Sequence, residues 1–253
     1  MLLSVLFFLL SIIPSALIIV WLMNRKKDDL QYKKSCKSAV VRGTAAILPI
    51  LVVSGVLSIL KNVLKITLFK NMTLLAYQAI HDFIVLAFAE ELVKFVMLRL
   101  LLKKRFNDYS FADVTAFMVI IGTAFGLVED IPYAVGASPG MMLIRGITMG
   151  HLGYGFIMGW FYGKRLYTDK KRYGVIAFAL PFFIHGLYDF SLSPELLEVN
   201  DNLSAIAVSL AVTDVILLVL TIRFFIRSRK KEYYNLTLTA SGQLPEQSDS
   251  GNQ

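Results

Sequence analysis

The sequence contains a single cysteine, Cys36, so no intramolecular disulfide can form and a thiol-based mechanism is not expected. We expect Cys36 to lie in a basic loop. Charged residues are scarce at 17%, whereas 56% of the 253 residues are hydrophobic. The sequence lacks the His-Glu-x-x-His motif of zinc proteases. These absences argue against a thiol protease and a zinc protease of that motif, and they leave a strongly apolar chain.

Long apolar runs dominate the chain. Several are long enough to cross, as helices, the roughly 30 Å of hydrocarbon in a bilayer. The sequence therefore predicts an all-α, polytopic membrane protein with about seven transmembrane helices, at residues 2–23, 39–60, 73–102, 111–135, 141–163, 174–192 and 203–226. The first run lacks the basic flank and the cleavage site of a signal peptide, so we expect it to be retained as a span.

The net charge of +8 would suggest nucleic acid as a partner in a soluble protein, but here the basic residues lie at the ends of the apolar runs. Loops after the first, third and fifth runs are basic, and so is the segment after the last run, whereas the loops between them carry few basic residues. By the positive-inside rule the N-terminus is outside and the C-terminus is cytoplasmic. We expect no nucleic acid partner, one transmembrane domain at 1–231 with a catalytic core at about 73–192, and a disordered polar tail at 232–253.

Two adjacent carboxylates and an ammonium, Glu90, Glu91 and Lys94, lie inside the third apolar run. Each ionised side chain at mid-bilayer depth costs roughly 2.5 to 3.5 kcal/mol, so such residues usually face a wet or protein-lined interior. On a helix, Lys94 is within salt-bridge reach of either glutamate. We expect Lys94 to keep one carboxylate ionised, which leaves the other able to act as a general base on water.

Three later runs also carry polar residues at helical spacing. Glu129 and Asp130 lie in the fourth run, and His151 begins a stripe of glycines in the fifth. Small residues at that spacing let a neighbouring helix approach closely, which places the histidine at a helix interface. In the sixth run His185 and Asp189 are one turn apart, so the carboxylate can fix the tautomer of the imidazole. Together with the carboxylate pair, these residues predict a convergent site.

Other polar residues within the runs lack such a pattern. Asp82, beside His81, lies in the third run, and Asp214 lies in the last. For Asp82 and Asp214 we expect a structural hydrogen bond rather than a catalytic role.

Carboxylates and imidazoles around a wet cavity support hydrolysis of a peptide bond. A carboxylate deprotonates water, and an imidazole stabilises the oxyanion or protonates the leaving amine. The same residue types bind zinc, for which the candidate ligands are Glu90, Glu129, His151 and His185. The residues alone do not choose between zinc and no metal. The alternative is a proton- or ion-coupled transporter, which also uses intramembrane Glu and His, although the chain lacks the internal symmetry common in transporters.

The polar motifs, taken in order, resemble those of the PrsW-type intramembrane proteases. The resemblance covers residues 89–190 and four motifs: EELVK at 90–94, FGLVE at 125–129, the His151 helix that runs into GWFYGK at 159–164, and HGLYD at 185–189. The family is a distant relative of the type II CAAX prenyl endopeptidases and the Abi/CPBP proteins.

The resemblance implies a protease of the bacterial cell membrane. Its substrate would be a single-span membrane protein, typically an anti-sigma factor whose site-one cut starts a stress response. The family has been described both as metalloprotease and as glutamate-dependent, so zinc and no metal both stay open. The matching site residues are the pair Glu90 and Glu91, then Glu129, His151, and His185 with Asp189. Asp130 is a departure, because the family commonly has Asn at this position.

We predict the following roles. Glu90 is the base on water, supported by Glu91 and Lys94. His151 positions the water together with Glu90, and His185, oriented by the aspartate one turn later, stabilises the oxyanion.

Overall fold

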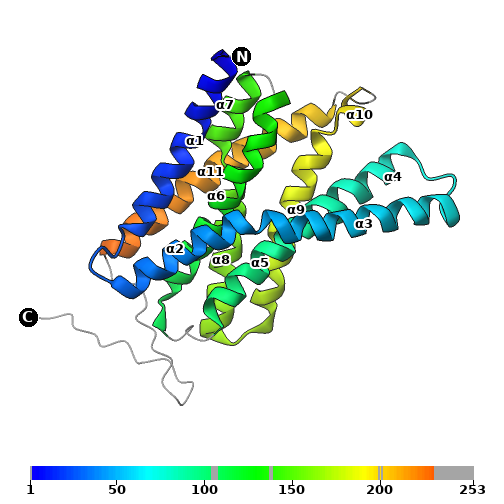
Figure 1. Ribbon diagram of the computed structural model, residues 1–253. Coiled ribbons are helices and arrows are strands. Elements are labelled where there is room, and N and C mark those ends of the chain that lie inside the picture. Colours follow the sequence, from blue (N-terminus) through cyan, green and yellow to red (C-terminus); the bar gives the residue numbers. More distant parts are fainter. Residues whose placement is uncertain (1, 104–107, 137–138, 199, 201, 231–253) are drawn as a thin grey trace, which may run out of the picture.

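The computed structural model describes residues 2–103, 108–136, 139–198, 200 and 202–230, and this part of the chain contains helices and no strand (Figure 1). The all-α prediction is therefore confirmed. The predicted tail, 232–253, lies outside the described residues. The elements are α1 (Leu2–Met23), α2 (Leu30–Ala45), α3 (Ile47–Thr67), α4 (Leu74–Ala79), the π-helix η1 (Ile80–Ala87), α5 (Phe88–Leu102), α6 (Phe111–Gly136), α7 (Pro139–Thr148), α8 (Gly150–Thr168), α9 (Lys171–Ser191), α10 (Pro194–Leu197) and α11 (Asn202–Lys230).

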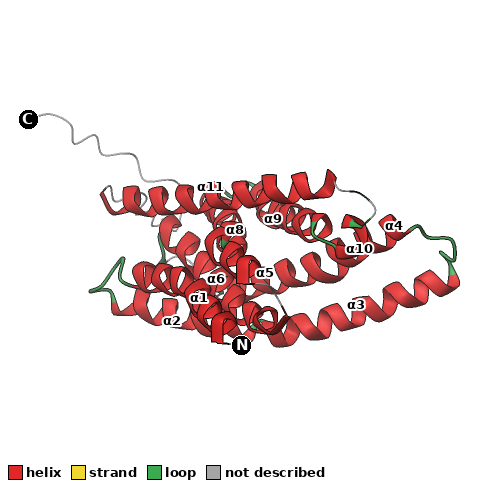
Figure 2. Ribbon diagram, turned by 90° about the horizontal axis from the view of Figure 1, so that it is seen from above, coloured by secondary structure: helices red, strands yellow, loops and turns green. Residues whose placement is uncertain are grey.

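Helix α6 is the centre of the bundle. Every side chain at residues 111–125 is buried, and Figure 2 shows α1, α2, α5 and α8 around this helix. A helix that is apolar on all sides is stable only when other helices or lipid cover it. The apolar composition of residues 111–125 therefore explains the central position of α6.

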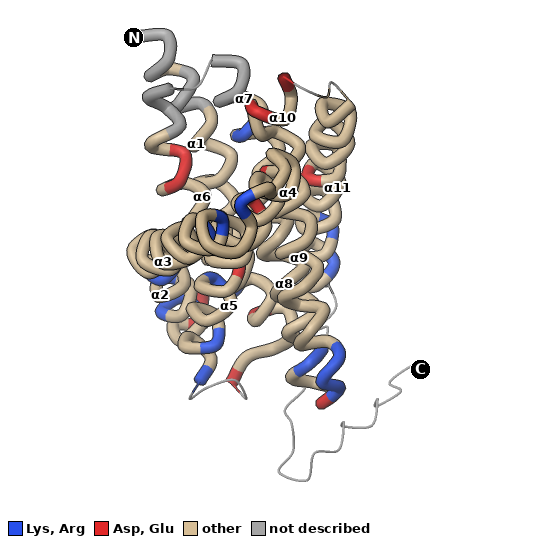
Figure 3. The backbone as a smooth tube through the Cα atoms, turned by 90° about the vertical axis from the view of Figure 1, so that its right-hand side faces the viewer, with Lys and Arg blue, Asp and Glu red and all other residues tan. Residues whose placement is uncertain are grey.

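Four helical stretches of the described chain are long and apolar enough to cross a membrane: Leu30–Thr67, Phe111–Pro132, Lys171–Ser191 and Asn202–Ser228. The apolar side chains of α3 are largely exposed, as expected of a surface that faces lipid. In Figure 3, Lys and Arg gather at the end of the bundle where α5 and α8 end.

Helix α2 begins well before the predicted second run. Its N-cap, Asp29, accepts a hydrogen bond from the Tyr32 N–H at 2.8 Å. The prediction that Cys36 lies in a loop is wrong, because this residue is fully buried in α2. The helix is amphipathic: Lys34 and Lys37 are exposed on one face, and the cysteine packs on the other. Basic residues that resemble a loop in the sequence are thus one face of a helix.

The predicted fifth span, 141–163, is not one helix. It divides at Met149, whose φ of 48° lies in the left-handed region between α7 and α8. This conformation is uncommon for residues other than glycine, and it costs roughly 1–2 kcal/mol. The break changes the direction of the chain two residues before His151, which therefore lies near the start of a new helix.

The third predicted run forms one continuous helical stretch made of α4, η1 and α5. Its middle part is π-helical, a geometry that often occurs next to functional sites. With α3, this stretch forms a hairpin that projects sideways from the bundle in Figure 1. The Glu90–Glu91 pair lies in the first turn of α5, directly after the π-helix.

Candidate active site

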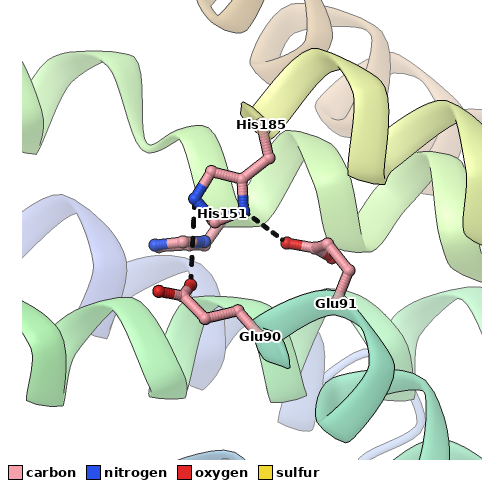
Figure 4. Close-up of side chains that lie close together, drawn as sticks. All are labelled: Glu90, Glu91, His151 and His185. Atoms are coloured by element: carbon pink, nitrogen blue, oxygen red, sulfur yellow. Dashed lines mark hydrogen bonds and ion pairs between the residues drawn. The ribbon is translucent and has the colours of Figure 1, made fainter. Parts of the chain in front are cut away.

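Three helices bring the predicted carboxylates and histidines together. Glu90 and Glu91 come from α5, His151 from α8 and His185 from α9 (Figure 4). One ligand atom from each of the four residues lies within 4.8 Å of those of the others. The sequence predicted that these residues converge, and in the structure they do lie together.

Lys94 connects the members of this cluster. Its Nζ lies 2.6 Å from Oε1 of Glu91 and 3.6 Å from Oε2 of Glu90, which confirms the predicted pairing. It also lies 3.1 Å from Nδ1 of His151. Lys94 and Glu91 are both almost completely buried. A buried carboxylate pair is tolerated in such a place only if a cation and hydrogen bonds compensate it, and Lys94 is that cation.

His185 lies between three carboxylates. Its Nδ1 is 2.9 Å from Oε1 of Glu91. Its Nε2 is 3.2 Å from Oδ2 of Asp189 and 3.8 Å from Oε2 of Glu90. The predicted contact with Asp189 is confirmed, and both ring nitrogens face carboxylates.

His151 is held from the other side by α6 and α7. Its Nε2 is hydrogen-bonded to Oε2 of Glu129, whose second oxygen lies 3.3 Å from the guanidinium of Arg145. The same guanidinium donates from Nε to Oδ1 of Asp130 at 2.8 Å. Sequence reasoning missed Arg145. The signal that was available is a cation inside the predicted span 141–163.

Glycines bring α6 and α8 close enough for these contacts. A Cβ on Gly155 would lie 2.8 Å from the carbonyl oxygen of Met118, and one on Gly159 would lie 2.9 Å from Cα of Thr115. The predicted helix interface along the glycine stripe is therefore confirmed. On α6, a Cβ at Gly126 would lie 3.1 Å from the ring of His151.

Aromatic rings enclose the imidazoles. Tyr154 stacks on His185 with ring centroids 5.1 Å apart and an interplanar angle of 25°. Phe125 meets His151 edge-on at 5.0 Å. The sequence analysis did not select Tyr154, although it lies one helical turn after His151.

A cavity of about 50 Å³ adjoins the histidines. This volume holds a few water molecules. The cavity is lined by Ser15, Thr123, Gly126, Glu129, Asp130, Arg145, Thr148, Met149, Gly150, His151, Leu152, Tyr154, His185, Tyr188 and Asp189. Glu90 and Glu91 are not part of this lining, whereas His151 and His185, which belong to the same cluster, are.

The remaining intramembrane carboxylates lie outside the cluster. Asp82 accepts a hydrogen bond from Gln78 at 3.1 Å, as predicted, while its second oxygen has no partner among the described residues. For Asp214, neither oxygen has a hydrogen-bond partner in the described part of the chain. The expected structural hydrogen bond is thus present at Asp82 and not found at Asp214. The ring nitrogen Nδ1 of His81 also lacks a partner there.

The donor set of the cluster suits a divalent metal such as zinc. It offers two imidazoles and two carboxylates, and the Oε2 atoms of Glu90 and Glu91 are buried without a hydrogen-bond partner among the described residues. The set contains Glu91 where the sequence suggested Glu129. Glu129 instead contacts His151, as carboxylates commonly do behind a metal-binding histidine. Lys94 contacts three of the four residues, so a metal ion would have to share the site with this ammonium or displace it.

Comparisons with known proteins agree with this geometry. The model of a family described as "PrsW family intramembrane metalloprotease" matches residues 37–221. Protease PrsW of Clostridioides difficile (strain 630) is 26% identical over 201 residues, which are 74% of this chain and 79% of that protein. Protease PrsW of Shouchella clausii is 29% identical over 121 residues, 46% and 56% of the two chains, and that of Geobacillus kaustophilus is 28% identical over 123 residues, 47% and 55%. No solved structure matches the chain. These descriptions name proteases, and the transporter alternative is not favoured.

Proposed function

We infer that this chain, which belongs to the PrsW family of intramembrane metalloproteases, hydrolyses a peptide bond of a membrane-anchored protein near that protein's span. The chain is a peptidase and an integral protein of the bacterial cell membrane. The observation that carries the proposal is the convergence of Glu90, Glu91, His151 and His185 beside a cavity.

Within this cluster we assign the role of general base to Glu90. Oε1 of Glu91 is engaged by both Lys94 and His185, whereas the contacts of Glu90 with the same two residues are longer, at 3.6 and 3.8 Å. The less engaged carboxylate is the better proton acceptor. Glu90 takes a proton from water, the water oxygen attacks the peptide carbonyl carbon, and the C–N bond breaks as the leaving nitrogen receives a proton.

The two histidines hold the reacting groups in place. We assign His151 to holding Lys94 and Glu129 in place, instead of the water contact expected from the sequence, because its two nitrogens contact these residues. His185 lies between Glu90 and Asp189, so it can carry the proton from the base to the leaving amine. We assign proton transfer to His185, in place of the oxyanion contact expected from the sequence, because both of its nitrogens face carboxylates.

A metal is compatible with this arrangement. When bound, zinc would be held by Glu90, Glu91, His151 and His185, and it would supply a more acidic water and a Lewis acid for the carbonyl oxygen. Glu129 would then fix the ring of His151 through Nε2.

We propose a single-span membrane protein as the substrate, of the anti-sigma-factor type, with a role in a stress response. Support comes from the four ordered motifs and from the position of the cluster within a bundle that contains four helical stretches long and apolar enough to cross a membrane.

We also propose about seven spans in a single domain at 1–231, with the core at about 73–192, the N-terminus outside, and a cytoplasmic tail at 232–253. The gathering of Lys and Arg at one end of the bundle in Figure 3 supports this orientation. Helices α7 and α8 together would make the fifth crossing.

Cleavage of candidate single-span proteins by the purified chain in liposomes tests the function. Glu90→Gln keeps the shape but removes the base, so cleavage should fall at least about 100-fold. Glu198→Gln, at an exposed residue, is the matched control and should cleave normally. Cleavage by Glu90→Gln at the wild-type rate would show that this site is not the catalyst.

A chelator separates the two forms of the mechanism. Loss of activity on chelation with rescue by zinc assigns Glu90 and His185 to metal binding. Activity that survives chelation assigns the reaction to carboxylate-activated water alone.

A further inference from the structure

Hydrolysis of a peptide bond places negative charge on the carbonyl oxygen, and proteases stabilise it with a hydrogen-bond donor in a dry site. Neither imidazole is free for this task. Both nitrogens of His185 face Glu91 and Asp189, and both nitrogens of His151 contact Lys94 and Glu129. A donor on the cavity wall is therefore needed.

Most donors on that wall are already used. The hydroxyls of Thr123 and Thr148 donate to carbonyl oxygens of their own helices, at 2.8 and 3.0 Å. Arg145 is paired with two carboxylates. Among the described lining residues, the remaining hydroxyl groups are those of Ser15, Tyr154 and Tyr188.

Tyr154 is the one of these three that contacts both imidazoles within the described chain. Its ring stacks on His185 at 5.1 Å and meets His151 at 5.8 Å and 87°. The residue is only 2% exposed, so its ring is locked in this orientation. Fixing the ring before the reaction means that no reorganisation opposes a hydrogen bond that forms in the transition state.

Gly150 leaves room for the hydroxyl of Tyr154. A Cβ on this glycine would lie 3.2 Å from the hydroxyl oxygen of Tyr154 and 3.2 Å from Oδ2 of Asp214, so the hydroxyl lies over the first turn of α8 near that carboxyl group. Met149, Gly150 and His151 line the cavity at the same place. The first turn of a helix favours negative charge, and the hydroxyl adds a hydrogen-bond donor there.

We propose that the Tyr154 hydroxyl is a catalytic hydrogen-bond donor to the oxyanion that forms on the scissile carbonyl. The proposal rests on the proposed peptidase function. The tyrosine keeps its proton throughout, so no bond of the side chain breaks. The hydrogen bond from this hydroxyl lowers the energy of the transition state and does not strengthen the binding of substrate.

Tyr154→Phe removes the hydroxyl and keeps the stacked ring. With the liposome assay above, kcat should fall about 100- to 1,000-fold while KM changes less than about threefold. Tyr162→Phe, at a tyrosine of the same helix that packs on Phe95 and is not among the cavity-lining residues, is the matched control and should keep kcat within about threefold of wild type. 3-Fluorotyrosine at position 154, a stronger donor of nearly the same size, should restore kcat. The melting temperature of each variant in detergent should equal that of wild type.

Three results would overturn the assignment. Tyr154→Phe could cleave the substrate at the wild-type rate while Glu90→Gln is inactive. This result would reject the catalytic role of Tyr154 and leave the proposed peptidase function intact. Tyr162→Phe could lose as much activity as Tyr154→Phe, or 3-fluorotyrosine at position 154 could fail to restore activity, and either result would mean a structural effect. Activity that survives in Glu90→Gln would instead reject the proposed function, and the role of Tyr154 with it.

Discussion

Two polar clusters lie on one continuous helical stretch, and only one of them joins residues of other helices in a candidate site. The π-helix η1 carries His81 and Asp82, and α5 carries Glu90 and Glu91. Asp82 and Glu91 are both almost completely buried. The hydrogen bond of Asp82 comes from Gln78 on the same stretch, whereas the glutamates of α5 contact a histidine from another helix.

The difference shows that a pair of buried charges becomes a site when other helices supply partners. Helix α9 brings His185, and α8 brings His151, which Lys94 connects to the glutamates. The approach of α8 depends on glycines that place its backbone against α6. The clusters contain similar residue types, so packing rather than composition distinguishes them.

The strongest test of this contrast removes the shared cation. Lys94→Met leaves two buried carboxylates without their ammonium, so the free energy of unfolding should fall by about 3–5 kcal/mol and cleavage should be lost. Denaturant unfolding in detergent measures the first effect. Lys65→Met, which removes only a cation–π contact of 4.1 Å with Tyr77, should cost less than about 1 kcal/mol. Equal stability of Lys94→Met and wild type would mean that the glutamates do not need this cation.

The next test separates two neighbouring acids of α6. Glu129→Gln weakens the hydrogen bond that fixes His151, so cleavage should fall about 10- to 100-fold. Asp130→Asn should stay within about threefold of wild type, because its contact is with Arg145 and not with an imidazole. Initial rates on one substrate measure both, and a larger loss in Asp130→Asn would reverse the assignment.

A smaller effect is expected where α8 meets α6. Gly155→Ala places a methyl group 2.8 Å from a backbone oxygen of Met118, so the free energy of unfolding should fall by about 1–3 kcal/mol. Gly55→Ala in α3, where a Cβ would meet nothing within 4 Å, should stabilise the fold by about 0.5–1 kcal/mol. A destabilisation of the same size at both glycines would argue against a specific close contact.

The smallest effect is expected in the π-helix. Asp82→Asn keeps an acceptor for Gln78 and removes a charge, so stability should change by less than about 1 kcal/mol and cleavage by less than about twofold. The same liposome assay measures it. A tenfold loss of cleavage would show that the η1 residues His81 and Asp82 take part in the reaction, so that both clusters would be functional.

Contacts within one helix were predictable from the sequence. The pairs Glu90–Lys94 and His185–Asp189 follow from the helical repeat, and the structure contains both. The all-α fold follows equally from the apolar runs. These features need only local geometry.

Contacts between helices were harder to predict. The cation that holds Glu129 is Arg145 of α7, and the histidine that Glu129 contacts, His151, follows a break at Met149 that no proline marks. Tyr154 joins the site through its stacking on His185, a residue of another helix. Such contacts depend on how the helices pack and turn, and one sequence carries little information on either.

The burial of Cys36 has a practical consequence for labelling experiments. The chain has no other cysteine, and this thiol is enclosed in α2, beyond the reach of water-soluble maleimides. The native protein should therefore give no labelling signal with such reagents. A cysteine placed at Ser15, on the cavity wall, would carry the sole reactive thiol, and its labelling rate would report on how water-soluble molecules reach the cavity beside the proposed catalytic cluster.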